Sequence, residues 1–379
     1  MRAFHGHWEG SLILDGLDNT FWVDIDADNQ LLTVSFPLRR QMFINVNEIT
    51  SSQKDGIVKF FLFDNPELGT FHLRKKDDNE ISCVFTQIYF NKQSILLKKK
   101  YDSPKKGASS YGPEPSKESL SLLLNQYRNF ELNKQDSVKV INYPKYDNGV
   151  LAMIRHYYKS EIIAGQGNDL DRAIRLTRWV NRYVRQKACV VALPPERNGL
   201  TLLNECTEKS AAMNCRGYAI ILNDLLLSVG IIARFVICKP ADIYDPECHV
   251  INEIYLSNMN KWVIMDGAFG CFICDENKNF LGLFDVRENL INDMPMQLWA
   301  NKDTKRTQYI DAYWYGMMKN CFRFLYYWDY APGCDNPLNR KTQYSLQPVG
   351  YDADNKHQYY TNCEIIHTTN KASFICAPF

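Results

Sequence analysis

The sequence lacks both a long run of apolar residues and an excess of charge of one sign. No stretch reaches the roughly 18 apolar residues that a membrane-spanning helix needs, and the opening residues contain no apolar segment of the kind a signal peptide carries. The 44 Lys and Arg residues nearly balance the 43 Asp and Glu residues, which leaves a formal net charge of +1. Because no global positive field is present, we expect neither nucleic acid nor membrane as a partner. Because neither a signal peptide nor a membrane span is recognised, we expect a cytoplasmic protein.

The chain has 379 residues, of which 45% are hydrophobic and 23% charged, so it is expected to fold into two or three globular domains. Its twelve Cys are scattered along the chain, without the dense spacing of a short secreted disulfide scaffold. We interpret them as reduced thiols, most of them small buried hydrophobic residues. Nothing in the sequence indicates an oligomeric state.

Residues 1–98 are predicted to form an antiparallel β barrel or sandwich. Short segments with alternating apolar residues follow one another at the spacing of a meander, separated by turn residues, and suggest about eight strands. The clearest segments are 21–26, 31–36, 42–46, 57–63, 70–74, 80–90 and 94–97.

Three short motifs in this region carry a resemblance. They are His5-Gly-His-Trp-Glu-Gly-Ser-Leu12, Ser35-Phe-Pro37 and Ile95-Leu-Leu97. Together they resemble the lipocalin-like β domain found at the N-terminus of some bacterial hydrolases. The resemblance implies either a unit that shields or positions the rest of the chain, or a cup that binds a ligand.

Residues 99–117 are expected to be a linker, since they are rich in Lys, Ser, Gly and Pro and offer little to bury. Their five Lys are better explained by a solvated tether than by a binding patch. From residue 118 to 379 the apolar spacing becomes helical, with predicted helices at 120–127, 148–158 and 169–184. We therefore predict an α+β domain for this part of the chain.

One predicted helix begins with a cysteine. Asn214 is a good N-cap, an apolar stripe runs from Tyr218 to Val229, and Gly230 is a good terminator, which places Cys215 in the first turn. Unpaired amides and the positive end of the helix dipole stabilise a thiolate and lower a thiol pKa from its reference value of about 8.5. The same amides can donate to an oxyanion.

Two predicted strands downstream offer a base and an orienting carboxylate. His249 begins the first strand, which runs to Tyr255, and Asp266 lies at the end of the second, which begins at Lys261. Antiparallel pairing of these strands brings Asp266 beside His249. The carboxylate can then bind one imidazole nitrogen, while the other takes the thiol proton.

Cys215 at the start of a helix that ends in Gly230-Ile-Ile-Ala-Arg234, then His249, then Trp262 four residues before Asp266, resembles the transglutaminase-like superfamily of the papain-like fold. The likeness covers roughly residues 169–268. It implies that Cys215 is the nucleophile, His249 the general base and acid, and Asp266 the orienting carboxylate.

The sequence departs from the family pattern at three positions. Ile251 stands where many members have Trp, and Cys238 stands where Gly is common. Lys209 lies about where papain-type enzymes place a Gln that donates to the oxyanion, so no side-chain donor can be named.

Each candidate residue also has a structural interpretation. A Cys at a helix start and a His among apolar residues are often core residues, and Asp266 before a glycine suits a turn. Glu253 is expected to anchor or solvate a strand edge, and Trp262 to lie in the core. The order and spacing of Cys215, His249 and Asp266 favour the catalytic interpretation.

A zinc site is a weaker interpretation. Cys271-Phe-Ile-Cys274, Cys238 and the Cys248-His249 pair could supply ligands, but no second Cys-x-x-Cys or His pair follows at finger spacing. Cys248 also points to the strand face opposite His249. We expect no metal and no cofactor.

The expected reaction is hydrolysis of a peptide or other amide bond through a thioester on Cys215. Acyl transfer to an amine uses the same thioester and stays open, as does a non-catalytic module that binds peptide or glycan. The aromatic residues after Thr307 suit either a core extension or the wall of a substrate cleft. In the absence of a Trp at position 251, we expect an open groove and a peptide or protein substrate.

Overall fold

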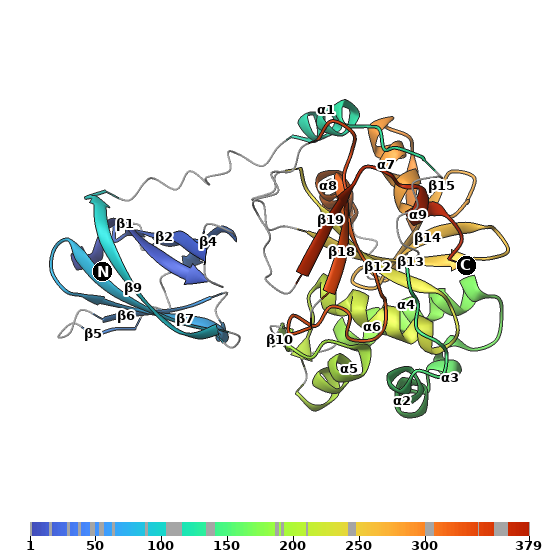
Figure 1. The fold of residues 1–379 in the computed structure, drawn as a ribbon, viewed down its shortest axis with the longest axis horizontal. Helices are drawn as coiled ribbons and strands as arrows, with labels where there is room; N and C mark the ends of the chain where they lie inside the picture. The colour runs from blue at the N-terminus through green and yellow to red at the C-terminus, as the bar shows by residue number, and fades with distance from the viewer. Residues whose placement is uncertain are drawn as a thin grey trace. The chain divides into compact units, whose positions relative to one another are not determined.

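The computed structural model divides into two compact units, the first ending at Pro115 and the second beginning at Ser116 (Figure 1). It describes residues 2–378 except 15–16, 29–30, 37–38, 46–49, 53–56, 63–64, 88–89, 104–115, 134–140, 186–188, 191–192, 210, 242–247, 300–306, 340 and 352–362. The part of the predicted linker between residues 104 and 115 therefore lies outside the described residues. Each unit is described by itself.

The first unit is a single nine-stranded sheet in the order β4-β3-β2-β1-β9-β8-β7-β6-β5. Every neighbouring pair is antiparallel, and the last strand pairs with the first. The sheet forms an antiparallel half-barrel, preceded by a short 3-10 helix, Arg2–Phe4. Its strands are β1 (Gly6–Leu14), β2 (Leu17–Asp26), β3 (Leu31–Phe36), β4 (Arg39–Asn45), β5 (Thr50–Ser52), β6 (Ile57–Leu62), β7 (Asn65–Lys75), β8 (Glu80–Gln87) and β9 (Phe90–Tyr101).

Strand β9 corrects two details of the sequence prediction. The segment 80–90 is two strands, and β9 runs without a break past the expected boundary at residue 98 to Tyr101. The alternation of apolar residues stops at Leu97, so the sequence pattern does not show that the strand continues. The lysines that follow still pair with β1. The Lys99 ammonium lies 5.2 Å from the ring centre of the buried Trp8, and this cation–π contact stabilises the charge within the strand.

The second unit is built on an eight-stranded sheet in the order β16-β15-β14-β13-β12-β17-β18-β19. All neighbours are antiparallel except β18 and β19, which are parallel. The predicted α+β class is thus confirmed. Its strands are β12 (Ala233–Lys239), β13 (His249–Leu256), β14 (Lys261–Asp266), β15 (Cys271–Asp275), β16 (Met296–Trp299), β17 (Arg323–Tyr327), β18 (Lys341–Leu346) and β19 (Cys363–Thr368); β10 (Cys189–Val190) and β11 (Ala211–Ala212) form a separate parallel pair.

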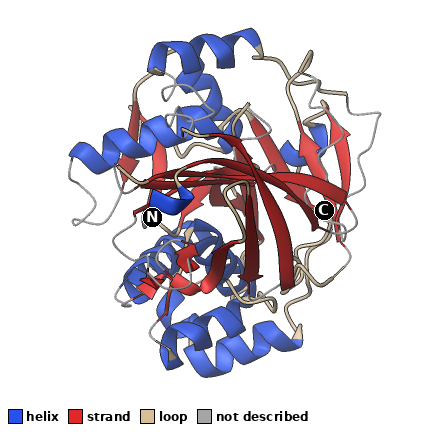
Figure 2. Ribbon diagram, turned by 90° about the vertical axis from the view of Figure 1, so that its left-hand side faces the viewer, coloured by secondary structure: helices blue, strands red, loops and turns tan. Residues whose placement is uncertain are grey.

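Helices cover both faces of this sheet. Figures 1 and 2 show α1, α7 and α8 on one side and α2 to α6 on the other. Their bounds are α1 (Lys117–Gln126), α2 (Gly149–Tyr158), α3 (Ser160–Ala164), α4 (Asp169–Arg185), α5 (Gly199–Glu208), α6 (Cys215–Ser228), α7 (Leu283–Ile291) and α8 (Thr307–Asn320); α9 (Ala372–Ile375) follows the last strand. Helix α6 is buried on all sides from Gly217 to Ser228, so it is the central helix of the unit.

The aromatic residues near the C-terminus mostly belong to the core. Tyr326, Tyr327, Tyr330 and Tyr344 are each at most 2% exposed, as are Phe322 and Phe324. They pack around the sheet and extend its hydrophobic core, which is the simpler of the two sequence interpretations. These six side chains are therefore not a substrate wall.

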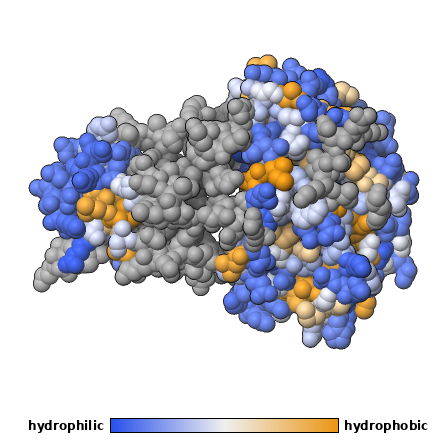
Figure 3. Space-filling model, in the orientation of Figure 1, coloured by the Kyte–Doolittle hydropathy of each residue, from blue (hydrophilic) through white to orange (hydrophobic). Residues whose placement is uncertain are grey.

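No helix among the described residues is long and apolar enough to cross a membrane. On the face of the second unit that Figure 3 shows, apolar side chains form separate spots within a mostly hydrophilic surface. Such scattered exposure is ordinary for folded proteins.

Candidate functional site

Helix α6 begins where the sequence predicts, with Cys215 as its first residue. The Asn214 side chain accepts a hydrogen bond from the Gly217 amide at 3.1 Å and caps the helix. A side chain at position 217 would come within 2.7 Å of the Met213 Cβ, so the tight packing of this turn requires glycine. At the other end, Gly230 adopts a φ of +80° and stops the helix.

The Cys215 thiol is the reactive candidate because its pKa is lowered. Burial raises the pKa, but a hydrogen bond to the His249 side chain and the positive charge of that imidazole outweigh the burial, with help from the Val250 amide and Arg216. By contrast, burial raises the pKa of the thiols of Cys83, Cys238, Cys271, Cys274 and Cys334. Among these thiols, Cys215 alone is favoured as a thiolate.

His249 and Asp266 form a short hydrogen-bonded pair. The imidazole Nε2 lies 2.6 Å from the Asp266 Oδ2, and Asp266 is completely buried. The last pair in the register of β13 and β14 is Asn252 with Met265, so His249 and Asp266 lie at the same end of the two strands. Burial of the imidazole lowers its pKa, but the Asp266 charge and hydrogen bond outweigh it and hold the pKa well above the usual range.

The turn after Asp266 fixes the carboxylate. The Phe269 amide donates to the Asp266 Oδ1 at 3.0 Å. The Asn181 side chain from α4 donates to the carbonyls of Gly267 at 3.2 Å and Ala268 at 2.7 Å. Gly270 has a φ of +64°, and a side chain there would lie 2.7 Å from the Asn181 Cγ. Sequence reasoning missed Asn181, because nothing in the pattern of α4 marks it as a contact to a turn far along the chain.

Two aromatic residues beside His249 were also missed. Phe269 lies in the turn after β14, and Tyr313 lies on α8. Both rings pack edge-on against the imidazole. The aromatic richness of residues 309–320 was visible in the sequence, but nothing singled out Tyr313 within it.

The candidate oxyanion donor is a backbone amide, and no side chain can be named for the same role. The Cys215 amide, at the first position of α6, has no hydrogen-bond acceptor among the described residues, as is usual for the first turn of a helix. Lys209 caps the C-terminus of α5 and pairs with Glu205 at 3.0 Å, and its side chain is 65% exposed. Its contacts place it in a surface ion pair, so it offers no evidence of a donor at the site.

The contacts of Glu253 and Trp262 are those of core residues. The Glu253 carboxylate lies 2.7 Å from the Arg234 guanidinium, and both side chains are only 1% exposed. The guanidinium in turn lies 3.8 Å from the ring centre of Trp262. Glu253 therefore anchors the sheet from inside the core and solvates no strand edge, and Trp262 belongs to the core as expected.

The cysteines considered for zinc do not gather. Cys271 and Cys274, three residues apart on β15, point to opposite faces of the strand. Within the described parts of the chain, the one group of potential metal ligands is His5, Asp26 and Asp28 in the first unit. The Ala27 amide donates to the His5 Nδ1 at 3.1 Å, so that ring nitrogen already has a partner.

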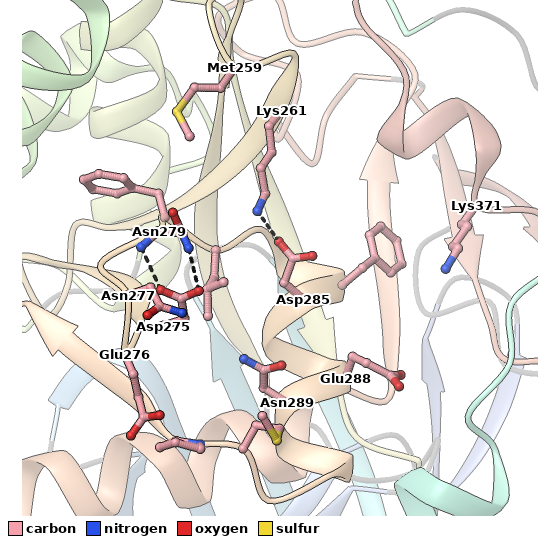
Figure 4. A pocket seen from close by; sticks show the side chains of 15 residues that line it. Met259, Lys261, Asp275, Glu276, Asn277, Asn279, Asp285, Glu288, Asn289 and Lys371 are labelled. Carbon is pink, nitrogen blue, oxygen red and sulfur yellow. Dashed lines mark hydrogen bonds and ion pairs between the residues drawn. The ribbon is translucent and has the colours of Figure 1, made fainter.

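A surface hollow of about 710 Å³ lies away from Cys215, around the start of α7 and the turn between β13 and β14 (Figure 4). Its polar side chains pair with one another: Lys261 with Asp285 at 2.8 Å, and Asp275 with Asn279. The hollow includes neither His249 nor Asp266, which lie at the opposite ends of their strands.

Comparison with known proteins gives a family match for the part of the chain that carries the candidate residues. Residues 156–267, which include all three candidate residues, match the transglutaminase-like superfamily. No curated protein matches the chain. A solved structure from Cytophaga hutchinsonii, named there as a candidate cysteine protease, is 14% identical over 78% of this chain and 82% of that chain, with a TM-score of 0.25. A TM-score this low does not establish a shared fold.

Proposed function

Because residues 156–267 are transglutaminase-like, a class of cysteine hydrolases and transferases, we propose that the protein hydrolyses an amide or peptide bond through a thioester on Cys215. One observation carries the proposal. A thiol with a lowered pKa lies beside an imidazole with a raised pKa, and a buried carboxylate holds that imidazole. Both shifts favour the thiolate and imidazolium forms over the neutral thiol and imidazole.

In the first half of the reaction, the Cys215 thiolate attacks the carbonyl carbon, and a C–S bond forms. The carbonyl oxygen takes the negative charge, and the Cys215 amide is placed to donate to it. His249 then gives its proton to the amide nitrogen, the C–N bond breaks, and the amine leaves. Asp266 keeps the Nε2 occupied, so the Nδ1 is the nitrogen that serves Cys215.

In the second half, water resolves the thioester. His249 takes a proton from the water, whose oxygen attacks the carbonyl carbon, and the C–S bond breaks to release a carboxylic acid. The proton stays on His249 and restores the ion pair. This chemistry requires no metal or cofactor, but it does require a reduced thiol, which fits the expected cytoplasmic location and reduced cysteines.

Thiol labelling tests the proposal directly. Iodoacetamide should modify Cys215 at pH 6 faster than Cys376, an exposed thiol that serves as internal reference, because only the former is paired with an imidazolium. Mass spectrometry of digested protein gives both rates in one sample. Labelling of Cys215 no faster than Cys376 at pH 6 would remove the nucleophile from the proposal.

Product analysis then separates water from an amine. Incubation with mixed peptides and a labelled primary amine should give cleavage that is lost in Cys215→Ala. Label incorporation that depends on Cys215 would assign acyl transfer instead. Tight peptide binding without either product would favour a binding module.

A further inference from the structure

Two aromatic rings pack on the candidate base and on each other. The ring centres of His249 and Tyr313 lie 6.0 Å apart at an interplanar angle of 87°, and those of His249 and Phe269 lie 5.8 Å apart at 84°. Phe269 and Tyr313 contact each other as well, at 4.7 Å and 70°. Each ring is thus edge-on to the other two, which is a favoured arrangement of aromatic rings.

Burial differs among the members of this group: Phe269 is half-buried, and the His249 side chain is 14% exposed. Tyr313 is 2% exposed and Asp266 is completely buried. The Tyr313 hydroxyl has no nitrogen or oxygen partner in the described part of the protein, and the thiol of Cys271 is the polar group beside it. The contact that Tyr313 makes with the imidazole is therefore made by its ring and not by its hydroxyl.

We propose that Tyr313 and Phe269 are positioning residues that fix the rotation of the His249 ring and keep water from its bond to Asp266. This inference rests on the proposed function, in which Nε2 must stay on Asp266 while Nδ1 faces Cys215. An imidazole held only by one hydrogen bond can still rotate about its bond to Cβ. Rings packed on it remove that freedom, and a dry environment strengthens the hydrogen bond.

The ring proton of His249 reports this directly. In the wild-type protein the Nε2 proton shared with Asp266 should give a far-downfield proton NMR signal, assigned by its loss in His249→Ala. Tyr313→Phe keeps the ring and should keep the signal. Tyr313→Leu opens a path for water and should broaden or remove it by exchange.

Labelling of Cys215 gives a second readout. In Tyr313→Leu the iodoacetamide rate at pH 6 should fall about tenfold, while the rate at pH 9.5 should be unchanged, because the loss is in the thiolate fraction. Tyr313→Phe should restore the wild-type profile. A change confined to low pH distinguishes positioning from a general loss of folded protein.

Tyr344→Leu is the matched control. Like Tyr313, Tyr344 is 2% exposed, and its hydroxyl has no hydrogen-bond partner among the described residues. Tyr344 lies in β18, away from His249, and its ring packs on Phe374. It should leave both readouts unchanged. A downfield signal that persists in Tyr313→Leu, or one that Tyr313→Phe also loses, overturns the inference. A wild-type protein that shows the expected signals but cleaves nothing would instead count against the proposed function alone.

Discussion

Each of the two units contains a histidine hydrogen-bonded to a buried aspartate across neighbouring antiparallel strands. In the first unit the His7 Nδ1 lies 2.6 Å from the Asp24 Oδ1, and in the second the His249 Nε2 lies 2.6 Å from the Asp266 Oδ2. Both aspartates are at most 4% exposed. The distance alone does not tell the two pairs apart, although the His249 side chain is 14% exposed and that of His7 only 1%.

The group at the second ring nitrogen separates them. The His7 Nε2 lies 2.9 Å from a further carboxylate, that of Glu9, so both nitrogens face acidic oxygens. In the second unit, the Cys215 thiol at the start of a helix helps to raise the pKa of His249 through a hydrogen bond and its charge. A buried His–Asp pair is therefore not by itself a sign of catalysis; the chemistry depends on what the remaining nitrogen contacts.

Replacing each histidine by alanine should give the largest contrast. Without His249 the Cys215 thiol loses its positive partner, its pKa rises toward about 8.5, and iodoacetamide labelling at pH 6 falls on the order of 100-fold. His7→Ala should leave labelling within about twofold, since both ring nitrogens of His7 lie against carboxylates. Equal losses in both variants would show that labelling follows global unfolding.

Replacing each aspartate by asparagine should give the same contrast between the two units, with a smaller effect on labelling. Asp266→Asn removes the charge that raises the pKa of His249, so the imidazole loses its proton at a lower pH. The pH range in which Cys215 and His249 form an ion pair therefore ends at a lower pH. Labelling of Cys215 at pH 7 should fall about tenfold. Asp24→Asn should instead lower the thermal stability of the first unit. The pH profile of labelling, compared with circular dichroism melting of both variants, checks this.

A buried carboxylate without an imidazole sharpens the comparison further. Asp224 on α6 accepts from the Gly199 amide at 2.7 Å and from Asn223, and burial outweighs these bonds and raises its pKa to about 6. A carboxylate whose pKa is higher in the folded than in the unfolded state destabilises the fold once the pH exceeds the unfolded-state pKa. The folded state therefore loses stability as pH rises from about 4 to 6.

Asp224→Asn should therefore stabilise the protein by about 2 kcal/mol at pH 8 and change little at pH 4. The new amide can donate to the Asn223 Oδ1, which has no hydrogen-bond partner among the described residues. Denaturant unfolding at the two pH values measures the difference. Destabilisation at pH 8 would show that the carboxylate is needed in its charged form.

Local signals in the sequence were sufficient for the elements that carry the site. The N-cap at Asn214, the stop at Gly230 and the alternation after His249 predicted the start of α6 and the hairpin of β13 and β14 as the structure has them. The proximity of His249 and Asp266 follows from that hairpin, whereas Cys215 comes from α6, which packs against β13. Their catalytic roles stay predictions.

Contacts between distant segments were not predictable in the same way. Asn181 and Tyr313 reach the site from helices whose sequence patterns only indicate which face is buried. Lys209 was considered because of its place in the order of the chain, whereas its side chain turns to Glu205. The burial of the Glu253 charge depends on Arg234, a cross-strand partner that becomes visible only with the register.

The pairing of β1 with β9 affects how the first unit can fold. Its sheet joins residues near position 7 to residues near position 100, while the other pairs connect consecutive strands. Such a closing contact has a high sequence separation and forms slowly relative to the hairpins. During synthesis, β1 must therefore wait for β9 to leave the ribosome before the central pairing of the sheet can form, so a chain interrupted before residue 90 lacks the strand that joins its two halves.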